Sequence, residues 1–366
     1  MLDKRDMTTP GEQHGLSREL RLLLTMSVPT VVITASRTVV SFTDMFMVSR
    51  LGTEAAAALM PANLGVFCLI ALGMGTMTAV NTYSSQCLGR GRPEDAARYA
   101  MQALLAALSF GVLAIPLIPL VPGFARTFGH APEVLKLEME YMGIALLSVG
   151  PSIGAVGVAY YFVGLHRPRI SMYASLWEVL ANLVGNYALI YGHFGFPAMG
   201  VAGCAWSTLF ASSSRLAFLL IWFWSAPYRR EFKTGEALRV ELSKMAGLLR
   251  VGLPVGASFS IELISWTVFI NYLVGRFGTA HLAANNFVFQ YLHISFMPAV
   301  GIGMSLSAVI GKAIGQRDYP LAVRRYYLGT ALCVGWMGLC GAAFLIWREP
   351  LIGFWTDDPE VIAVGM

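Results

Sequence analysis

Nine apolar stretches, each long enough to cross a bilayer as a helix, constrain this chain more than any other feature. A helix needs about 20 apolar residues to span the hydrocarbon core. The stretches lie at approximately 22–48, 55–80, 100–122, 141–165, 170–192, 199–225, 251–275, 282–311 and 326–347. Charged residues make up only 13% of the 366 residues, about half the share of a typical soluble domain. The sequence therefore predicts an all-α polytopic membrane protein.

Lysine and arginine are distributed unevenly between the two sides of the predicted membrane. With a cytoplasmic N-terminus, 19 of the 26 basic residues fall in cytoplasmic segments, five in external segments and two within spans. Cytoplasmic loops of membrane proteins carry such an excess of basic residues. We therefore expect a multi-pass protein of the cell (inner) membrane, with its N-terminus in the cytoplasm. The net charge of +5 reflects this topology, and no nucleic-acid patch is expected.

The sequence carries no signature of an enzyme or of a bound cofactor. No HExxH, GxSxG or paired-aspartate motif stands within a predicted span. The five cysteines are scattered through apolar stretches, in a pattern typical of neither a disulfide framework nor a zinc site. We expect no catalytic activity, no cofactor and no resident metal.

The chain repeats itself at an offset of about 226 residues. Four pairs of segments match in order: Pro29 with Pro254, Arg50–Thr53 with Arg276–Thr279, Leu88–Arg90 with Ile314–Gln316, and Pro132–Val134 with Pro359–Val361. Both copies begin on the cytoplasmic side, and the first contains six spans. We expect two parallel six-helix repeats related by a pseudo-two-fold axis along the membrane normal, as in several transporter folds.

The predicted organisation has four parts. Residues 1–21 form a cytoplasmic N-terminal segment, 22–225 an N-lobe of six transmembrane helices, and 226–250 a cytoplasmic amphipathic linker. Residues 251–366 form a truncated C-lobe with three transmembrane helices and the start of a fourth. A complete second repeat would need roughly 85 further residues. We therefore expect the chain to be C-terminally incomplete.

A few polar residues fall inside the predicted spans. An ionised group there costs about 2.5–3.5 kcal/mol at the bilayer centre. Asp44 lies near the outer end of the first span, with Asn182, Asn186 and Thr208 at similar depths in the fifth and sixth. Oxygen groups around one carboxylate suit a proton or Na+, and a buried carboxyl without a cation favours its neutral form. The alternative role for the asparagines is hydrogen bonding between helices.

Four other charges form two pairs of opposite sign at matching depths. Glu178 and Arg215, on consecutive spans, predict a structural ion pair within the N-lobe. Arg37 and Glu262 occupy equivalent positions in the two repeats. They predict a contact between the lobes that breaks as the lobes rock.

Several segments together resemble the multidrug and toxic compound extrusion (MATE) transporters, with NorM-like features. The segments are 41–58 (SFTDMFMVSRLGTEAAAA), 84–100 (SSQCLGRGRPEDAARYA), 182–209, 248–266 and 296–318. The resemblance covers residues 20–366. It implies two six-helix lobes in a V around a central cleft.

The resemblance also implies roles for individual residues. Asp44 is similar to the family's first-helix coupling aspartate, and Asn182, Asn186 and Thr208 are similar to the polar groups beside it. Glu262 is similar to the seventh-helix glutamate of the NorM-like branch. The DinF-like branch has an aspartate where this chain has Asn186, so this site holds one acid fewer.

The expected function is secondary-active export of small amphipathic or cationic compounds, by alternating access of the two lobes. Coupling to H+ or Na+ antiport would occur at Asp44 and Glu262, with Na+ held by Asp44, Asn182 and Asn186. Two alternatives stay open: a lipid-linked oligosaccharide flippase of the same superfamily, and a truncated remnant that does not transport. We expect a monomer whose other partner is the bilayer.

Overall fold

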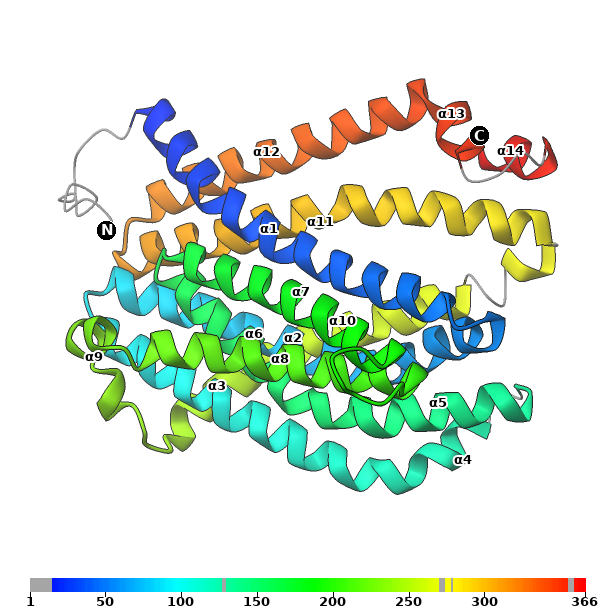
Figure 1. The fold of residues 1–366 in the computed structure, drawn as a ribbon. Coiled ribbons are helices and arrows are strands. Elements are labelled where there is room, and N and C mark those ends of the chain that lie inside the picture. Colours follow the sequence, from blue (N-terminus) through cyan, green and yellow to red (C-terminus); the bar gives the residue numbers. More distant parts are fainter. Residues whose placement is uncertain (1–14, 127–129, 270–273, 278, 355–358) are drawn as a thin grey trace.

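The computed structural model describes residues 15–126, 130–269, 274–277, 279–354 and 359–366, which are helical and contain no strand. The long helices run roughly side by side (Figure 1). They are α1 (Leu16–Ser49), α2 (Thr53–Gly89), α3 (Pro93–Ala114), α5 (Pro132–Ala145), α6 (Val149–Gly164), α7 (Pro168–Tyr191), α8 (Gly200–Phe223), α10 (Leu242–Val268), α11 (Thr279–Gly315) and α12 (Tyr319–Ile346). The short helices are η2 (Ile115–Leu120), α4 (Val121–Arg126), η3 (Leu146–Ser148), α9 (Ala226–Phe232), η4 (Thr234–Glu236), η6 (Val274–Phe277), α13 (Arg348–Gly353) and α14 (Pro359–Gly365).

The predicted spans correspond to these helices. Eight helical segments of the described chain are long and apolar enough to cross a membrane. The remaining predicted stretch, 170–192, the fifth along the chain, is α7, a helix of 24 residues. Glu178, Asn182 and Asn186 lower its mean hydropathy. The expectation of a multi-pass, all-α membrane protein is confirmed.

Proline and glycine mark several helix boundaries. Pro93 and Pro168 stand in the first turns of α3 and α7, where the missing N–H of proline costs no hydrogen bond. Gly192 follows α7 with a φ of 76°, a left-handed conformation that ends a helix readily only when the residue has no side chain. At the start of α12, the carboxylate of Asp318 accepts a hydrogen bond from the Leu321 amide at 3.0 Å.

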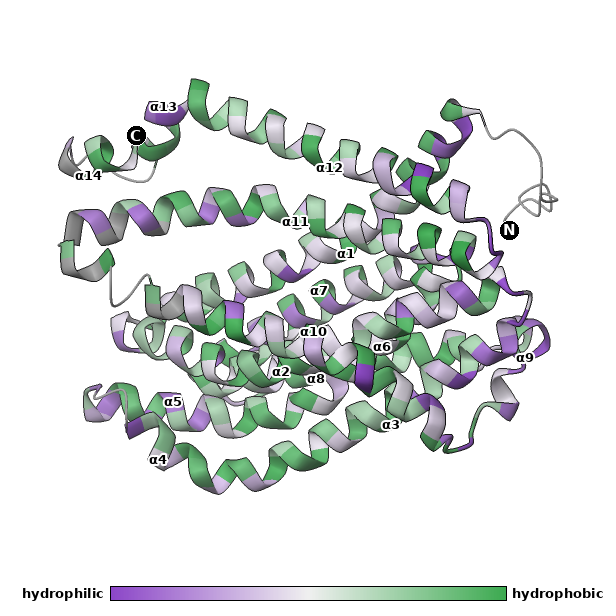
Figure 2. Ribbon diagram, turned by 180° about the vertical axis from the view of Figure 1, so that it is seen from behind, coloured by the Kyte–Doolittle hydropathy of each residue, from purple (hydrophilic) through white to green (hydrophobic). Residues whose placement is uncertain are grey.

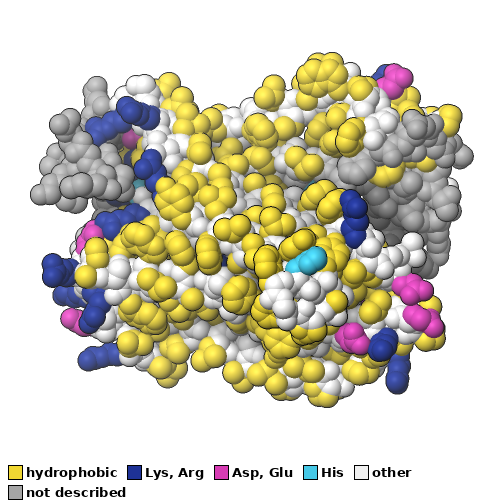
Figure 3. All heavy atoms as spheres, viewed as in Figure 1, with side chains coloured by type: hydrophobic (Ala, Val, Ile, Leu, Met, Phe, Trp, Pro, Cys, Tyr) yellow, Lys and Arg dark blue, Asp and Glu magenta, His cyan; other side chains and the backbone are white. Residues whose placement is uncertain are grey.

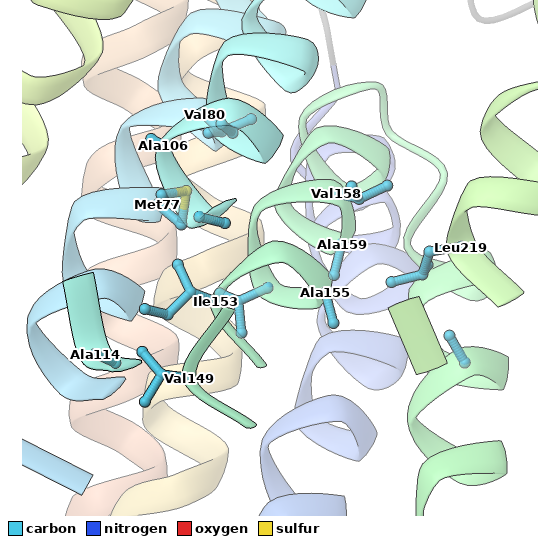
Figure 4. Packing of buried hydrophobic residues seen from close by; sticks show 14 of the residues in the cluster. Met77, Val80, Ala106, Ala114, Val149, Ile153, Ala155, Val158, Ala159 and Leu219 are labelled. Atoms are coloured by element: carbon cyan, nitrogen blue, oxygen red, sulfur yellow. The ribbon is translucent and has the colours of Figure 1, made fainter. Parts of the chain in front are cut away.

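Helix α6 lies at the centre of the bundle formed by α1 to α8, which we call the N-lobe. It contacts α2, α3, α7 and α8. Figure 4 shows Ile153 of α6 beside Met77 of α2, and Ala155 of α6 on the side facing Leu219 of α8. All four side chains are buried. Many of the other core residues are alanines, which lets helix main chains approach closely, as is usual in membrane bundles.

The C-terminal helices α10 to α14 pack against the N-lobe mainly through α10 on α2 and through α11 on α1 and α2. Gly252 and Gly256 of α10 lie directly against the main chain of α2. A methyl group on Gly256 would collide with the Leu72 carbonyl oxygen. One turn further along, the Ser260 hydroxyl donates to the Cys68 carbonyl oxygen at 3.1 Å. This face of α10 therefore requires small residues.

The segment predicted as the linker, 226–250, contains two short helices and the start of a long one. Its first part forms α9 and η4, but α10 already begins at Leu242. The polar start of α10 is stabilised by Lys244, whose ammonium contacts Asp95 at 3.1 Å and Glu241 at 2.6 Å. These ion pairs neutralise the charge of Lys244. The first turns of α10 can therefore be helical although they precede the apolar stretch that begins near residue 251.

The segment predicted to be cytoplasmic, 1–21, includes the first turn of α1. Residues 1–14 lie outside the described chain, but α1 begins at Leu16. Glu19 is buried in its first turn, four and seven residues before buried Leu23 and Met26. This spacing places Glu19 on the packed face of α1.

The molecule has polar ends and an apolar middle (Figure 2), the arrangement of a protein that crosses a bilayer. Hydrophilic residues concentrate toward the two ends of the bundle, and hydrophobic residues cover the middle (Figure 2). In the face shown in Figure 3, lysine and arginine gather mostly at the end that carries the N-terminus and α9. Large exposed side chains such as Phe42, Leu113 and Ile221 belong to the apolar surface. A surface of this kind is suited to contact with lipid.

The glycine contact between α10 and α2 can be tested by adding one methyl group. We expect Gly256→Ala to lower the apparent Tm of the purified protein in detergent, since overpacking of this kind costs about 1–3 kcal/mol. Gly335→Ala on α12 is the control, because nothing lies within 4 Å of its added carbon and alanine favours a helix by about 1 kcal/mol. Equal Tm values for wild type and Gly256→Ala would contradict the close contact.

Candidate functional site

The Asp44 carboxyl is surrounded by polar side chains from two other helices. The Asn182 and Asn186 side-chain amides donate to its Oδ1 at 3.0 and 2.6 Å. The Thr208 hydroxyl lies 3.5 Å from Oδ2. Asn186 also donates to Asn182 Oδ1 at 3.2 Å. The structure thus brings together the four residues predicted from depth and spacing, and we call them the Asp44 cluster.

The cluster depends on close packing of α7 against α8. Asn182 and Asn186 are one helical turn apart and face Asp44 together. Ser207 of α8 donates to the Asn182 carbonyl oxygen at 2.9 Å. Any side chain at Gly185 would collide with Ser207, so glycine at this position allows the two helices to meet. Thr208, the residue after Ser207, is thereby brought to the carboxyl group.

The cluster is almost completely removed from solvent. Asp44 is 8% exposed, Asn182 1% and Asn186 0%. No basic side chain of the described residues forms an ion pair with Asp44, so its charge is offset only by neutral donors. Burial opposes the charged form of a carboxyl group, while amide donors favour it. A group balanced in this way is suited to binding and releasing a proton.

One acceptor in the cluster is left without a partner. Asn186 Oδ1 is buried and forms no hydrogen bond within the described chain. Together with Asp44 Oδ2 and the Thr208 hydroxyl, it offers oxygen atoms of the type that a hard cation prefers. The described residues include no group of three His, Cys, Asp or Glu side chains that could hold a metal ion. The oxygens around Asp44 therefore fit Na+ better than a transition metal.

The ion pair predicted between Glu178 and Arg215 is present. Arg215 Nη1 lies 2.8 Å from Glu178 Oε2, and the side chains are 2% and 16% exposed. Glu178 is four residues before Asn182, and Arg215 is seven after Thr208, so both lie on the helix faces that form the Asp44 cluster. The pair is about 6–10 Å deeper along these helices, at 1.5 Å per residue.

The predicted pair between Arg37 and Glu262 is not formed. Arg37 donates from Nη1 to the Met74 sulfur at 2.9 Å, while the Glu262 side chain is exposed and forms no ion pair with it. Helix α10 turns Ser260 toward α2. Glu262 is two residues later, about 200° around the helix, and so faces away from α2. The equal depth of Arg37 and Glu262 does not specify the direction in which the Glu262 side chain points from α10.

Sequence reasoning missed a second buried ion pair, between Glu19 and Arg325. Arg325 Nε lies 2.7 Å from Glu19 Oε2, with the side chains 7% and 2% exposed. Arg325 Nη1 also donates to the Val309 carbonyl oxygen at 3.1 Å. The pair joins α1 to α12 across the two halves. The spacing of Glu19 from Leu23 and Met26 is the sequence signal that could have revealed it.

Comparison with known proteins identifies the family. A family model described as MatE matches residues 29–188 and 254–366. The chain belongs to the MatE family. The two matched regions begin 225 residues apart, the offset between Pro29 and Pro254, which is compatible with the predicted repeat. The MATE resemblance drawn from the sequence is confirmed.

Bacterial relatives of this MatE protein align with nearly all of it. The "Probable multidrug resistance protein NorM" of Chromobacterium violaceum is 29% identical over 353 residues, covering 95% of this chain and 75% of the relative. The protein of the same name from Rhizobium meliloti is 26% identical over 354 residues, covering 96% and 76%. The "Multidrug resistance protein PmpM" of Pseudomonas aeruginosa is 29% identical over 362 residues, covering 95% and 73%.

Solved structures share the fold. A crystal structure of MATE in complex with MaD3S aligns with a TM-score of 0.85 at 20% identity, covering 95% of this chain and 78% of the other. An outward-facing multidrug resistance MATE family transporter of the MOP superfamily aligns with a TM-score of 0.80 at 20% identity, covering 95% and 77%. The described helices of this MatE protein thus adopt the arrangement of the MATE fold.

The Glu178–Arg215 pair should be essential for stability. We expect Glu178→Gln to lower the free energy of unfolding, measured by detergent denaturation, by about 3–5 kcal/mol, because it leaves the Arg215 cation buried without its partner. Removing both charges in Glu178→Gln/Arg215→Met should restore much of the loss. The control is Glu231→Gln, which breaks a partly exposed pair with Arg167 and should cost about 0–1 kcal/mol. An equal cost for the two single variants would contradict burial of the pair.

Proposed function

We propose that this protein is a secondary-active exporter of small amphipathic or cationic compounds, driven by H+ or Na+ antiport. The observation that carries the proposal is the Asp44 cluster. It combines a buried carboxyl group, neutral donors and a free amide oxygen. Such a site changes its charge when it binds or loses a small cation.

A coupling site must favour one conformation over another. A ligand shifts a conformational equilibrium only when it binds the two states with different affinity. Helix α1, which carries Asp44, contacts α7 on one side and α11 on the other. A cation at Asp44 stabilises the packing of α1 against α7, because the oxygens of Asn186 and Thr208 then help to hold it. The release of the cation leaves a costly buried charge, which favours movement of α1.

The substrate class rests on the relatives. The proteins from Chromobacterium violaceum and Rhizobium meliloti are named probable multidrug resistance proteins, and the one from Pseudomonas aeruginosa a multidrug resistance protein. Identities of 26–29% over more than nine-tenths of this chain support the same broad activity. We therefore assign export of drug-like compounds across the inner membrane.

Contacts between the two halves support alternating access. Ser27 and Ser305 share a hydrogen bond of 2.7 Å between α1 and α11, and the Asn81 amide of α2 donates to the Met304 carbonyl oxygen at 2.9 Å. These two hydrogen bonds and the Glu19–Arg325 ion pair all lie toward the end of the bundle that carries the basic loops. Since basic loops are cytoplasmic, we assign this arrangement to a state that is closed on the cytoplasmic side.

Asp44 can be tested by removing its charge while keeping its shape. We expect Asp44→Asn to abolish substrate transport driven by an imposed H+ or Na+ gradient in proteoliposomes, because the amide cannot take up or release the coupling cation. The control is Glu54→Gln, an exposed acid in the first turn of α2, which should transport like wild type. Gradient-driven transport that survives Asp44→Asn would refute the coupling role.

The cytoplasmic closure can be tested through Glu19. In a cysteine-free background with Ser27→Cys, we expect Glu19→Gln to speed labelling of the new thiol by a cytoplasmic maleimide at least about tenfold. Loss of one member of a buried ion pair costs about 3–5 kcal/mol, and about 1.4 kcal/mol is tenfold in an equilibrium. The double variant Glu19→Gln/Arg325→Met should label more slowly than Glu19→Gln. Unchanged labelling in Glu19→Gln would show that the pair does not hold the two halves together.

A further inference from the structure

The turn between α6 and α7 carries a histidine that reaches across to the other half of the molecule. His166 Nε2 donates to the Ala308 carbonyl oxygen of α11 at 3.2 Å, and the imidazole is half-buried. The start of α7 and the end of α11 both lie at the end of the bundle that carries α9 (Figure 1). The hydrogen bond therefore joins the N-lobe to the C-terminal helices on the side that we assign to the cytoplasm.

The turn itself is anchored to the N-lobe. His166 has a φ of 60°, a left-handed conformation that is uncommon for a residue with a side chain. The neighbouring Arg167 is directed toward α9, where its guanidinium lies 5.0 Å from the ring centroids of Tyr228 and Phe232. The same group pairs with Glu231 at 2.6 Å. If the two halves separate, His166 therefore stays with the N-lobe and loses its acceptor on α11.

The imidazole lies beside the ion pair that joins α1 to α12. Arg325 Nη1 donates at 3.1 Å to the carbonyl oxygen that follows Ala308 in α11, so the two side chains bind consecutive acceptors of one helix. Glu19 supplies the carboxylate for Arg325, at 2.7 Å. Lys312 is four residues after Ala308, on the same face of α11. Among the described residues, His166 thus faces two basic groups and a single carboxylate, which Arg325 already binds.

This position is suited to a neutral imidazole. The tautomer with its hydrogen on Nε2 already satisfies the Ala308 carbonyl oxygen. A proton on Nδ1 would add a further positive charge beside Arg325 and Lys312, in a space that is partly closed to water. Burial, with a smaller contribution from the charge of Lys312, lowers the pKa of His166 to about 3, well below its ordinary value of about 6.5. An imidazole freed from this contact and hydrated would bind a proton far more readily.

We propose that His166 is a gating residue that makes the cytoplasmic closure sensitive to cytoplasmic protons. The closed arrangement holds the imidazole unprotonated, and the open arrangement lets it bind a proton, so a fall in pH favours opening. The effect grows as the pH falls below about 6.5 and vanishes above it. Acidification of the cytoplasm would thus favour the state that takes up substrate from that side. The proposal rests on the cytoplasmic closure proposed above, and it does not involve Asp44.

The test measures the distance between the two halves at two pH values. Nitroxide labels are attached through Arg230→Cys on α9 and Tyr319→Cys at the start of α12, both exposed, in a cysteine-free background, and the distance is measured by double electron–electron resonance. The background also carries Glu19→Gln, which weakens the closure so that both states are populated and removes a second titratable group. We expect the ratio of long to short distances to rise about tenfold from pH 7.5 to pH 5.5, because pH 5.5 is about one unit below the ordinary pKa of imidazole.

Replacement of the histidine should remove this response. His166→Gln keeps an N–H donor of similar reach for the Ala308 carbonyl oxygen but cannot take up a proton, so its distance ratio should not rise between the two pH values. His166→Asn is a second variant, because asparagine adopts the left-handed conformation readily, and it should behave in the same way. His193→Gln is the matched control. His193 is an exposed histidine in the connection between α7 and α8, at the other end of α7, and its replacement should leave the tenfold response intact.

The outcomes separate this role from the proposed function. A pH response that is lost in His166→Gln and kept in Asp44→Asn supports the gating role. Equal responses with and without His166→Gln overturn it, and so does a response that only Asp44→Asn abolishes, which would assign the pH dependence to the coupling site. If Glu19→Gln produces no longer distance at either pH, the cytoplasmic closure itself is refuted, and the role of His166 falls with it.

Discussion

A bilayer offers no water to a charged side chain, so the protein itself must solvate every ionised group that its helices carry into the membrane. Helix α1 meets this requirement in three different ways. Asp44 is solvated by two amide groups of α7, and Glu19 by the guanidinium of Arg325. Arg37 has only a sulfur atom as a direct acceptor. Helices α7 and α12 thus supply polar partners to α1 in addition to packing against it.

The sequence was sufficient to predict the features that depend on depth and on spacing within one helix. The spans follow from apolar length, while the orientation expected from the basic residues stays a prediction. Asn182 and Asn186, four residues apart at the depth of Asp44, predicted a cluster that the structure contains. Glu178 and Arg215 were predicted for the same reason, because consecutive antiparallel helices bring side chains of equal depth together.

The features that the sequence could not predict depend on rotation of helices about their axes. Arg37 and Glu262 are at similar depths, but α10 turns Gly256 and Ser260 toward α2, which directs Glu262 away. The same small residues decide which faces of the two halves meet. Glu19 and Arg325 lie 306 positions apart, and their pairing depends on how α12 packs near α1. The start of α10 at Leu242 could not be predicted either, because Asp95 on a distant segment stabilises its polar first turn.

Helix α1 also contains Pro29, a buried residue that lies between Glu19 and Arg37 in the sequence. Proline removes one main-chain hydrogen bond and makes a helix easier to bend at that point. Glu19 and Asp44 are separated by 25 residues, or about 37 Å of helix. The arm before Pro29 is joined to α12 by the Glu19–Arg325 pair, and the arm after it carries Asp44, where we propose that the coupling cation binds. Because α1 bends easily at Pro29, a change in the charge of Asp44 near one membrane surface can be transmitted along this helix to the Glu19–Arg325 ion pair near the other surface.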